Sequence, residues 1–270
     1  DLMTFWNTSG GLPYSFEAVQ TPEWKKLSGR AHRYKRYEIP SHMSILLAGC
    51  DVQQDRLEVS VFGVHKKQFF LVTHEVLYGN PANIDDEVWT ELDELLAKTW
   101  KKQNGMPISI FKCSIDAHYL TNSVAQFARK RKIVIPVTGI DNNWSADIMP
   151  PKFLFVKRNG KFDKTGKKRW PLGVSLLKMD LYNRLKLDEL ATESIHFPKD
   201  MPDEYYKQLT GEVCNFAENS RGETKRIWEK RYDAVEALDC AVYTLALYKI
   251  CGFHLWDDVK WNKSISKVNI

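Results

Sequence analysis

The chain has 270 residues, of which 43% are hydrophobic and 27% are charged, and its formal net charge is +5. These values are ordinary for a soluble globular protein with one large domain, and no apolar run approaches the ~18 residues that a membrane-spanning helix needs. The N-terminus has neither the basic nor the apolar region of a secretory signal, so we expect a cytoplasmic protein with no membrane partner.

The five cysteines are scattered along the chain and form no CxxC pair. This pattern argues against a disulfide framework and a structural zinc site, and it favours small core residues. Because the sequence begins at Asp1 rather than at methionine, it resembles a fragment. Residues 1–42 are irregular and are interpreted as a linker or lead-in, residues 43–252 as the folded domain, and residues 253–270 as a C-terminal tail.

The first half of the domain predicts three strands followed by alternating helices and strands. The three strands, joined by short polar turns, are expected at residues 44–50, 57–64 and 68–77. Such a run is typical of an antiparallel meander. The elements after it are a helix at 84–103, a strand at 108–115, a helix at 120–132 and a strand at 133–137. Strands with helical crossovers after a meander indicate an α/β fold with a mixed sheet.

Residues 139–173 are rich in glycine, proline and lysine and are interpreted as a flexible basic insertion. Within them, residues 157–169 hold seven basic residues and one acid, which accounts for the whole positive excess of the chain. Such a segment is expected where a chain meets a polyanion, and a solvated loop is the alternative. The remaining elements are predicted as a helix at 176–187, a hairpin at 212–216 and 226–229, and a helix at 233–250.

Acidic residues interrupt three otherwise apolar elements. Asp51 ends the first strand, Asp116 ends the strand at 108–115, and Glu236 and Asp239 share one face of the last helix. Carboxylates near a core are costly unless they are paired or bind a metal ion. Converging carboxylates suit Mg²⁺ or Mn²⁺, and a pair of such ions serves phosphodiester hydrolysis. Taken alone, an aspartate at a strand end is usually a turn or cap residue, and an aspartate within a helix is most often exposed.

At these residues the sequence resembles the lambda-like group of phage terminase large subunits, from about residue 5 to residue 250. The segments that carry the resemblance are Phe5-x-Asn7-Thr8, Leu47-Ala48-Gly49-Cys50-Asp51-Val52-Gln53-Gln54-Asp55-Arg56, Ile115-Asp116, His196-Phe197-Pro198, Gln208-Leu209-Thr210-x-Glu212, Trp228, and Glu236-Ala237-Leu238-Asp239-Cys240-x-Val242-Tyr243. They occur in the order that the family shows, and their combination is more specific than any single segment.

The resemblance implies an RNase H-like nuclease domain that cuts concatemeric viral DNA. It implies Asp51, Asp116 and Asp239 as metal-binding and catalytic residues and Glu236 as a further catalytic residue, with two Mg²⁺ or Mn²⁺ ions as cofactor. The implied partners are double-stranded DNA, the ATPase domain of the same full-length chain, the small terminase subunit and the portal, in the host cytoplasm. This chain should not hydrolyse ATP, because residues 160–168 lack the spacing and the Ser or Thr of a P-loop.

Three positions depart from the family pattern. Val235 replaces an asparagine, Ser175 replaces a common aspartate, and His118 stands where glycine is frequent. His118 follows Asp116 by two residues and is a candidate phosphate contact, with an exposed loop histidine as the alternative. The other candidate contacts to nucleic acid are the basic residues Lys157, Arg158, Lys161, Lys164, Lys167, Lys168 and Arg169.

Two other functions are compatible with these residues. Another RNase H-like nuclease, of the resolvase or integrase type, would share the acids, although resolvases are usually shorter and dimeric. A non-catalytic DNA-docking module would bind a metal ion only for its structure. Cleavage of plasmid DNA with Mg²⁺ or Mn²⁺ separates the docking module from the nucleases. The choice between linear duplex and four-way junction then separates the two nucleases.

Overall fold

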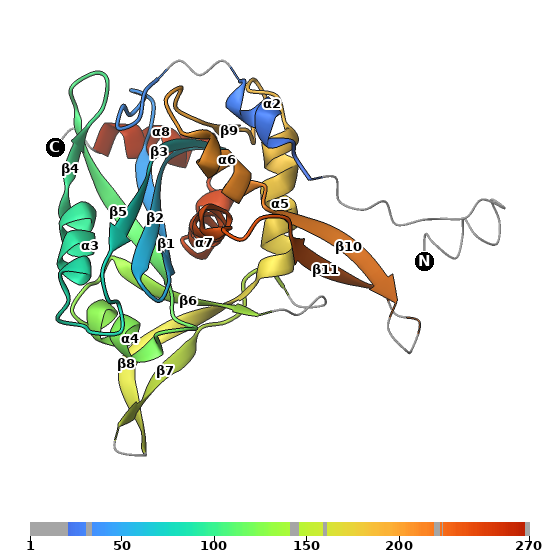
Figure 1. Cartoon of the computed structure of the whole chain (residues 1–270). Helices are drawn as coiled ribbons and strands as arrows, with labels where there is room; N and C mark the ends of the chain where they lie inside the picture. The colour runs from blue at the N-terminus through green and yellow to red at the C-terminus, as the bar shows by residue number, and fades with distance from the viewer. Residues whose placement is uncertain are drawn as a thin grey trace.

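The computed structural model describes residues 21–30, 34–140, 146–158, 161–218, 222 and 224–267, and the side chains at 157, 158, 161–165, 224 and 265–267 lie outside this description. The expected Phe5-x-Asn7-Thr8 segment therefore lies outside the described residues. Figure 1 shows a central sheet with helices on both faces and two hairpins that project from the body. Within the described residues, no helix has the length and apolar character needed to cross a membrane.

In the described part of the chain, the central sheet has nine strands in the order β7-β8-β6-β5-β1-β2-β3-β9, and β4 pairs with β5 outside this path. The strands are β1 (Ile45–Val52), β2 (Arg56–His65), β3 (Gln68–Tyr78), β4 (Thr99–Lys101), β5 (Pro107–Asp116), β6 (Val134–Ile140), β7 (Lys152–Arg158), β8 (Lys161–Gly173) and β9 (Ile195–His196). The first three form an antiparallel meander, and β1, β5, β6 and β8 run parallel. The predicted mixed α/β sheet is confirmed.

Helices cover the two faces of this sheet, as Figure 1 shows. One face carries α3 (Glu87–Ala97) and α4 (Thr121–Arg129). The elements of the other face are α2 (Trp24–Ser28), α5 (Val174–Lys186), α6 (Asp203–Leu209), α7 (Glu236–Ile250), the 3-10 helix η1 (Phe253–Leu255) and α8 (Asp258–Lys267). The predicted hairpin forms a separate two-stranded sheet of β10 (Glu212–Glu218) and β11 (Thr224–Lys230).

The strand β1 shows how the sheet serves two cores. Leu46 and Cys50 pack in the core under α3 and α4, whereas Ile45 and Leu47 pack in the core under α5 and α7. This alternation follows from the two-residue period of a strand. The helix α7, by contrast, is buried around most of its circumference and lies directly against the sheet.

Two predicted elements are corrected by the structure. The helix expected at residues 84–103 ends at Ala97, because residues 99–101 pair with β5 as the short strand β4 and bury Trp100. Most of the described residues in 139–173 form strands rather than a loop, because they make up β7 and β8, and β8 continues the sheet in parallel with β6. The many lysines of β8 hide this strand pattern, whereas Leu154 and Val156 of β7 are buried against α4.

The segments expected to precede and follow the domain also contribute to its core. Leu27 and Tyr34 are buried, and Ile39 pairs with Lys102 beside β4. Trp261 of α8 is 2% exposed and packs near Phe253 and Trp256. Four of the five cysteines are buried, as expected for small core residues.

Candidate active site

Two parallel strands bring Asp51 and Asp116 side by side. The register between β1 and β5 pairs Cys50 with Ile115, and the next position on each strand is an aspartate. Because Cys50 and Ile115 face α3 and α4, the strand period turns both aspartates toward α7. Asp51 is 4% exposed and Asp116 is 6% exposed, so both predicted acids are buried at one edge of the sheet.

The helix α7 approaches this edge more closely than a side chain would allow. A Cβ atom at Gly49 would lie 2.1 Å from the carbonyl oxygen of Cys240, so only glycine fits between β1 and α7. On the next strand, Ser114 donates a hydrogen bond of 2.9 Å to the carbonyl oxygen of Tyr243. These contacts bring the first turn of α7, with Asp239, close to the two strand ends.

The pKa values indicate that the acids are close enough to repel one another. Burial raises the pKa of Asp51 well above its ordinary value, and the charges of Asp239, Asp116 and Glu236 raise it further. Burial also raises the pKa of Asp239 to about 6, against the opposing effect of Lys178. The pKa of Asp116 is raised by burial although backbone amides, including that of His118, hydrogen bond to it. The structure therefore brings the three predicted aspartates together.

The oxygen atoms of the cluster are the kind of ligand that a hard cation prefers, but the carboxylates do not lie at the distances from one another that a bound ion requires. Among the described residues, no group of three or more His, Cys, Asp or Glu residues is arranged to hold a metal ion. Gln53 donates a short hydrogen bond to Asp51. Oε1 of Glu236 accepts a hydrogen bond of 3.2 Å from the Arg56 guanidinium, whereas the buried Oε2 has no hydrogen-bond partner. Oxygen donors, mutual repulsion and an unpartnered oxygen all fit Mg²⁺ or Mn²⁺.

A buried lysine that the sequence did not identify joins this cluster. Lys178 of α5 places Nζ 2.7 Å from Oε2 of Glu212 and 3.7 Å from Oδ1 of Asp239. Glu212, at the start of β10, is itself 6% exposed. In the sequence, the only sign of this role is a lysine among the apolar residues of a predicted helix, and that pattern does not indicate which carboxylates the lysine contacts.

A second group of polar side chains supports the cluster from β2. Glu58 lies opposite Asp51 in the register of β1 and β2 and is 2% exposed. Burial tends to raise the pKa of Glu58, but hydrogen bonds from His74 and Arg56 outweigh that effect and lower it. Arg56 also contacts Glu236, so one guanidinium forms ion pairs with two acids near Asp51.

His118 is exposed, and its backbone amide donates a hydrogen bond of 3.1 Å to Asp116. A groove of about 860 Å³ opens beside these residues, lined by Gln53, Gln54, Asp55, Arg56, Gly79, Asn80, Ala82, Tyr119 and Leu120. The groove is lined by residues that follow the ends of β1 and β5, and none of the clustered aspartates lines it.

The predicted basic residues lie apart from the carboxylates. Lys167 donates a hydrogen bond to the carbonyl oxygen of Arg131, which precedes β6, whereas Asp116 pairs with Val137 farther along that strand. Residues 131–133 form the turn before β6, whereas Trp170, which follows Arg169 on β8, pairs with Val137, so Arg169 lies two strands away from Asp116. Lys168 is exposed and Arg169 is half-buried. The side chains that lie outside the described part of the chain are those of Lys157, Arg158, Lys161 and Lys164.

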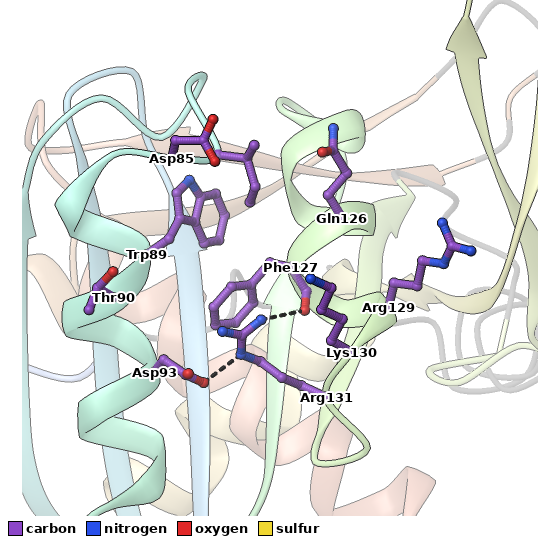
Figure 2. Close-up of a pocket in the computed structure, with 10 residues that line it drawn as sticks. Asp85, Trp89, Thr90, Asp93, Gln126, Phe127, Arg129, Lys130 and Arg131 are labelled. Atoms are coloured by element: carbon purple, nitrogen blue, oxygen red, sulfur yellow. Dashed lines mark hydrogen bonds and ion pairs between the residues drawn. The ribbon is translucent and has the colours of Figure 1, made fainter.

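A pocket of about 380 Å³ between α3 and α4 contains none of the predicted acids. Figure 2 shows Arg131 extended across the Phe127 ring toward Asp93, with Arg129 and Lys130 beside it. Arg131 is thus committed to internal contacts on the face of the sheet opposite to α7. This pocket does not contribute to the carboxylate cluster.

Comparison with known proteins identifies the family. Residues 1–261 match the family model described as the endonuclease domain of terminase large subunit gpA. The chain is 28% identical to the terminase large subunit of Escherichia phage lambda and 26% identical to that of Enterobacteria phage P21, over 92% of its own length in each case. It spans 38% and 39% of those two proteins, respectively.

Solved terminase structures show a more distant likeness. A crystal structure of the large terminase from a thermophilic bacteriophage gives a TM-score of 0.49 at 13% identity, and the match covers 89% of this chain and 47% of that one. The large terminase nuclease of another thermophilic phage, G20c, gives a TM-score of 0.37 at 12% identity, with coverage of 76% and 81%, respectively. The family assignment rests on the match in sequence.

Proposed function

The chain belongs to the family of terminase large subunit gpA endonuclease domains, and we propose that it cuts double-stranded DNA by metal-dependent hydrolysis of phosphodiester bonds. The observation that carries this proposal is the cluster of buried Asp51 and Asp116 with partly exposed Asp239, whose pKa values are all raised by desolvation and whose charges repel one another. Such a cluster costs the protein stability unless a cation neutralises it.

In this mechanism the three aspartates would hold two Mg²⁺ or Mn²⁺ ions, and Glu236 would contribute its unpartnered Oε2. Bound ions supply the positive charge that activates the attacking water and stabilises the leaving oxygen. Gln53 orients Asp51, the amide of His118 orients Asp116, and Arg56 orients Glu236. The deprotonated carboxylates are the binding form, so the raised pKa values mean that metal binding releases protons near neutral pH.

The substrate and partners of the whole protein follow only by analogy with the longer relatives. We propose concatemeric viral DNA as the substrate, cut in the host cytoplasm. The proposed partners are an ATPase domain of the full-length chain, a small terminase subunit and a portal. The basic residues of the β7–β8 hairpin would contact DNA phosphates away from the cut, and exposed His118 would contact a phosphate nearer to it.

Cleavage of supercoiled plasmid and linear duplex with Mg²⁺ or Mn²⁺ tests the proposal. Asp51→Asn and Asp239→Asn should each abolish cleavage. Asp180→Asn is a matched control, because the Asp180 and Asp239 side chains are 26% and 27% exposed, and Asp180 contacts Arg184 and Lys249 instead of the cluster. No cleavage by the wild type would favour a docking module. Preferential cleavage of a four-way junction would favour a resolvase.

A further inference from the structure

We propose that Lys178 is a catalytic residue of this nuclease and that its ammonium contacts the DNA phosphate that is cut. The proposal rests on the nuclease function proposed above. Lys178 is 8% exposed, and its Nζ lies between two carboxylates, 2.7 Å from Glu212 and 3.7 Å from Asp239. No other lysine in the described part of the chain has an ion pair with one of the three clustered aspartates.

The position of Lys178 is fixed before any substrate arrives. Tyr182, one turn later on α5, donates a hydrogen bond of 2.8 Å to the carbonyl oxygen of Glu212. Ser175, one turn earlier, accepts hydrogen bonds of 3.0 Å from both Arg226 and Trp228 of β11. These bonds join α5 to both strands of the β10–β11 hairpin on either side of Lys178. The ammonium therefore needs little reorganisation to act in a reaction.

The need of Glu212 for a partner does not by itself explain why the lysine lies beside Asp239. A buried ion pair of one lysine and one glutamate is electrically complete and could lie anywhere in the core. Here the same ammonium is also within 4 Å of a carboxylate that is a proposed metal ligand. A phosphate that reacts at this ligand must come close to the ammonium. Lysine is suited to that role, since its ammonium acts on phosphate as a compact charge.

The expected contribution is stabilisation of the negative charge that develops on the phosphate oxygens. A preorganised donor in a site that excludes water typically accelerates such a step by ~10²–10³-fold. Two other roles remain to be separated from this one. The lysine could serve only the stability of the fold through Glu212, or it could only position Asp239 for metal binding.

A matched pair of variants separates the three roles. Glu212→Gln is compared with the double variant Lys178→Met, Glu212→Gln, because the two proteins differ only at Lys178 and neither leaves a buried glutamate unpaired. At saturating Mg²⁺, we expect the double variant to cleave duplex ~10²–10³-fold more slowly than Glu212→Gln. If methionine disturbs folding, Lys178→Gln with Glu212→Gln removes the charge while keeping a hydrogen-bonding side chain.

Two readouts besides cleavage complete the test. Mn²⁺ affinity, measured by calorimetry without DNA, should be unchanged or tighter in the double variant. Duplex affinity, measured in Ca²⁺ at several salt concentrations, should lose about 0.9 from its log–log slope, as expected for one lost phosphate contact. Equal cleavage rates would leave Lys178 a structural residue and overturn the proposal, as would weaker Mn²⁺ binding with an unchanged salt slope. A wild type that cleaves no DNA would instead refute the nuclease function itself.

Discussion

Asp51→Asn should abolish cleavage and, in a metal chelator, stabilise the fold at neutral pH. The folded pKa values of Asp51, Asp116 and Asp239 are raised, so the folded protein keeps protons that the unfolded chain has already lost. The stability from these groups is therefore present below the unfolded pKa of about 4 and is lost as pH rises through the folded values. Replacing one aspartate by asparagine removes both a titrating group and a repulsive neighbour.

The size of the effect follows from Asp239. A rise of its pKa from 3.8 to about 6 corresponds to on the order of 3 kcal/mol of stability lost at neutral pH. Asp51 is more deeply buried, and its pKa is also raised well above the ordinary value. For a domain of this size, ~3 kcal/mol corresponds to a change in melting temperature of about 5 °C.

The assay must use the difference between variant and wild type, because other groups titrate in the same range. Burial lowers the pKa of His65 to about 4, so its contribution to stability is lost as pH falls, opposite in sign to the aspartates. Melting curves in EDTA should show Asp51→Asn gaining stability over the wild type between pH 5 and pH 7.5. Mg²⁺ or Mn²⁺ should then stabilise the wild type more than the variant. A variant that melts several degrees below the wild type at pH 7.5 would instead show that Asp51 is structural.

Three further changes test the surroundings of the cluster. Gly49→Ala should destabilise the fold by about 3 kcal/mol in thermal melts and should impair cleavage, because the new Cβ would displace α7 at Cys240. An unchanged melting temperature would contradict the close packing of β1 against α7. Ser175→Ala should cost about 1 kcal/mol, because the half-buried side chains of Arg226 and Trp228 lose their hydrogen bonds to the Ser175 hydroxyl. Unaltered hydrogen exchange in β11 would refute this. Removing hairpin lysines should lower the log–log salt slope of duplex binding by about 0.9 for each lost contact, whereas removing four exposed control lysines should not. The hairpin set is Lys161, Lys164, Lys167 and Lys168. The control set is Lys25, Lys26, Lys186 and Lys199.

The residues of the site that the sequence could predict are those whose immediate neighbours in the sequence mark them as unusual. Asp51 and Asp116 each end an apolar strand, and Asp239 interrupts an apolar helix. Parallel strands place their carboxyl ends at one edge, so the period and the order of elements suffice to bring the first two together. The meander was equally predictable, because its three strands are neighbours in both sequence and space.

The parts that escaped prediction depend on partners far away in the sequence. Lys178 and Glu212 are 34 residues apart, and nothing local to either residue indicates that they meet. Likewise Glu58 acquires its role from His74 on the neighbouring strand. The strand β8 was missed for another reason. Its lysines resemble those of a solvated loop, and its pairing with β6 becomes visible only when the sheet is assembled.

The acids around the strand ends fall into two classes according to whether a cation accompanies them. Glu58 and Glu236 share Arg56, and Glu212 has Lys178 at 2.7 Å. The aspartates lack an equivalent: the nearest cation to Asp239 is the same Lys178, at the longer distance of 3.7 Å. Asp51 and Asp116 have no ion pair among the described residues, although each accepts a hydrogen bond.

This division matters because the paired and unpaired acids share one buried region. If the fold required only that buried carboxylates be neutralised, the aspartates would be expected to have protein cations like those of the glutamates. Instead, the protein supplies cations to the surrounding glutamates and leaves the central aspartates with raised pKa values. The charge deficit is therefore concentrated on the three residues at the strand ends and the first turn of α7, where a divalent cation would relieve the most repulsion.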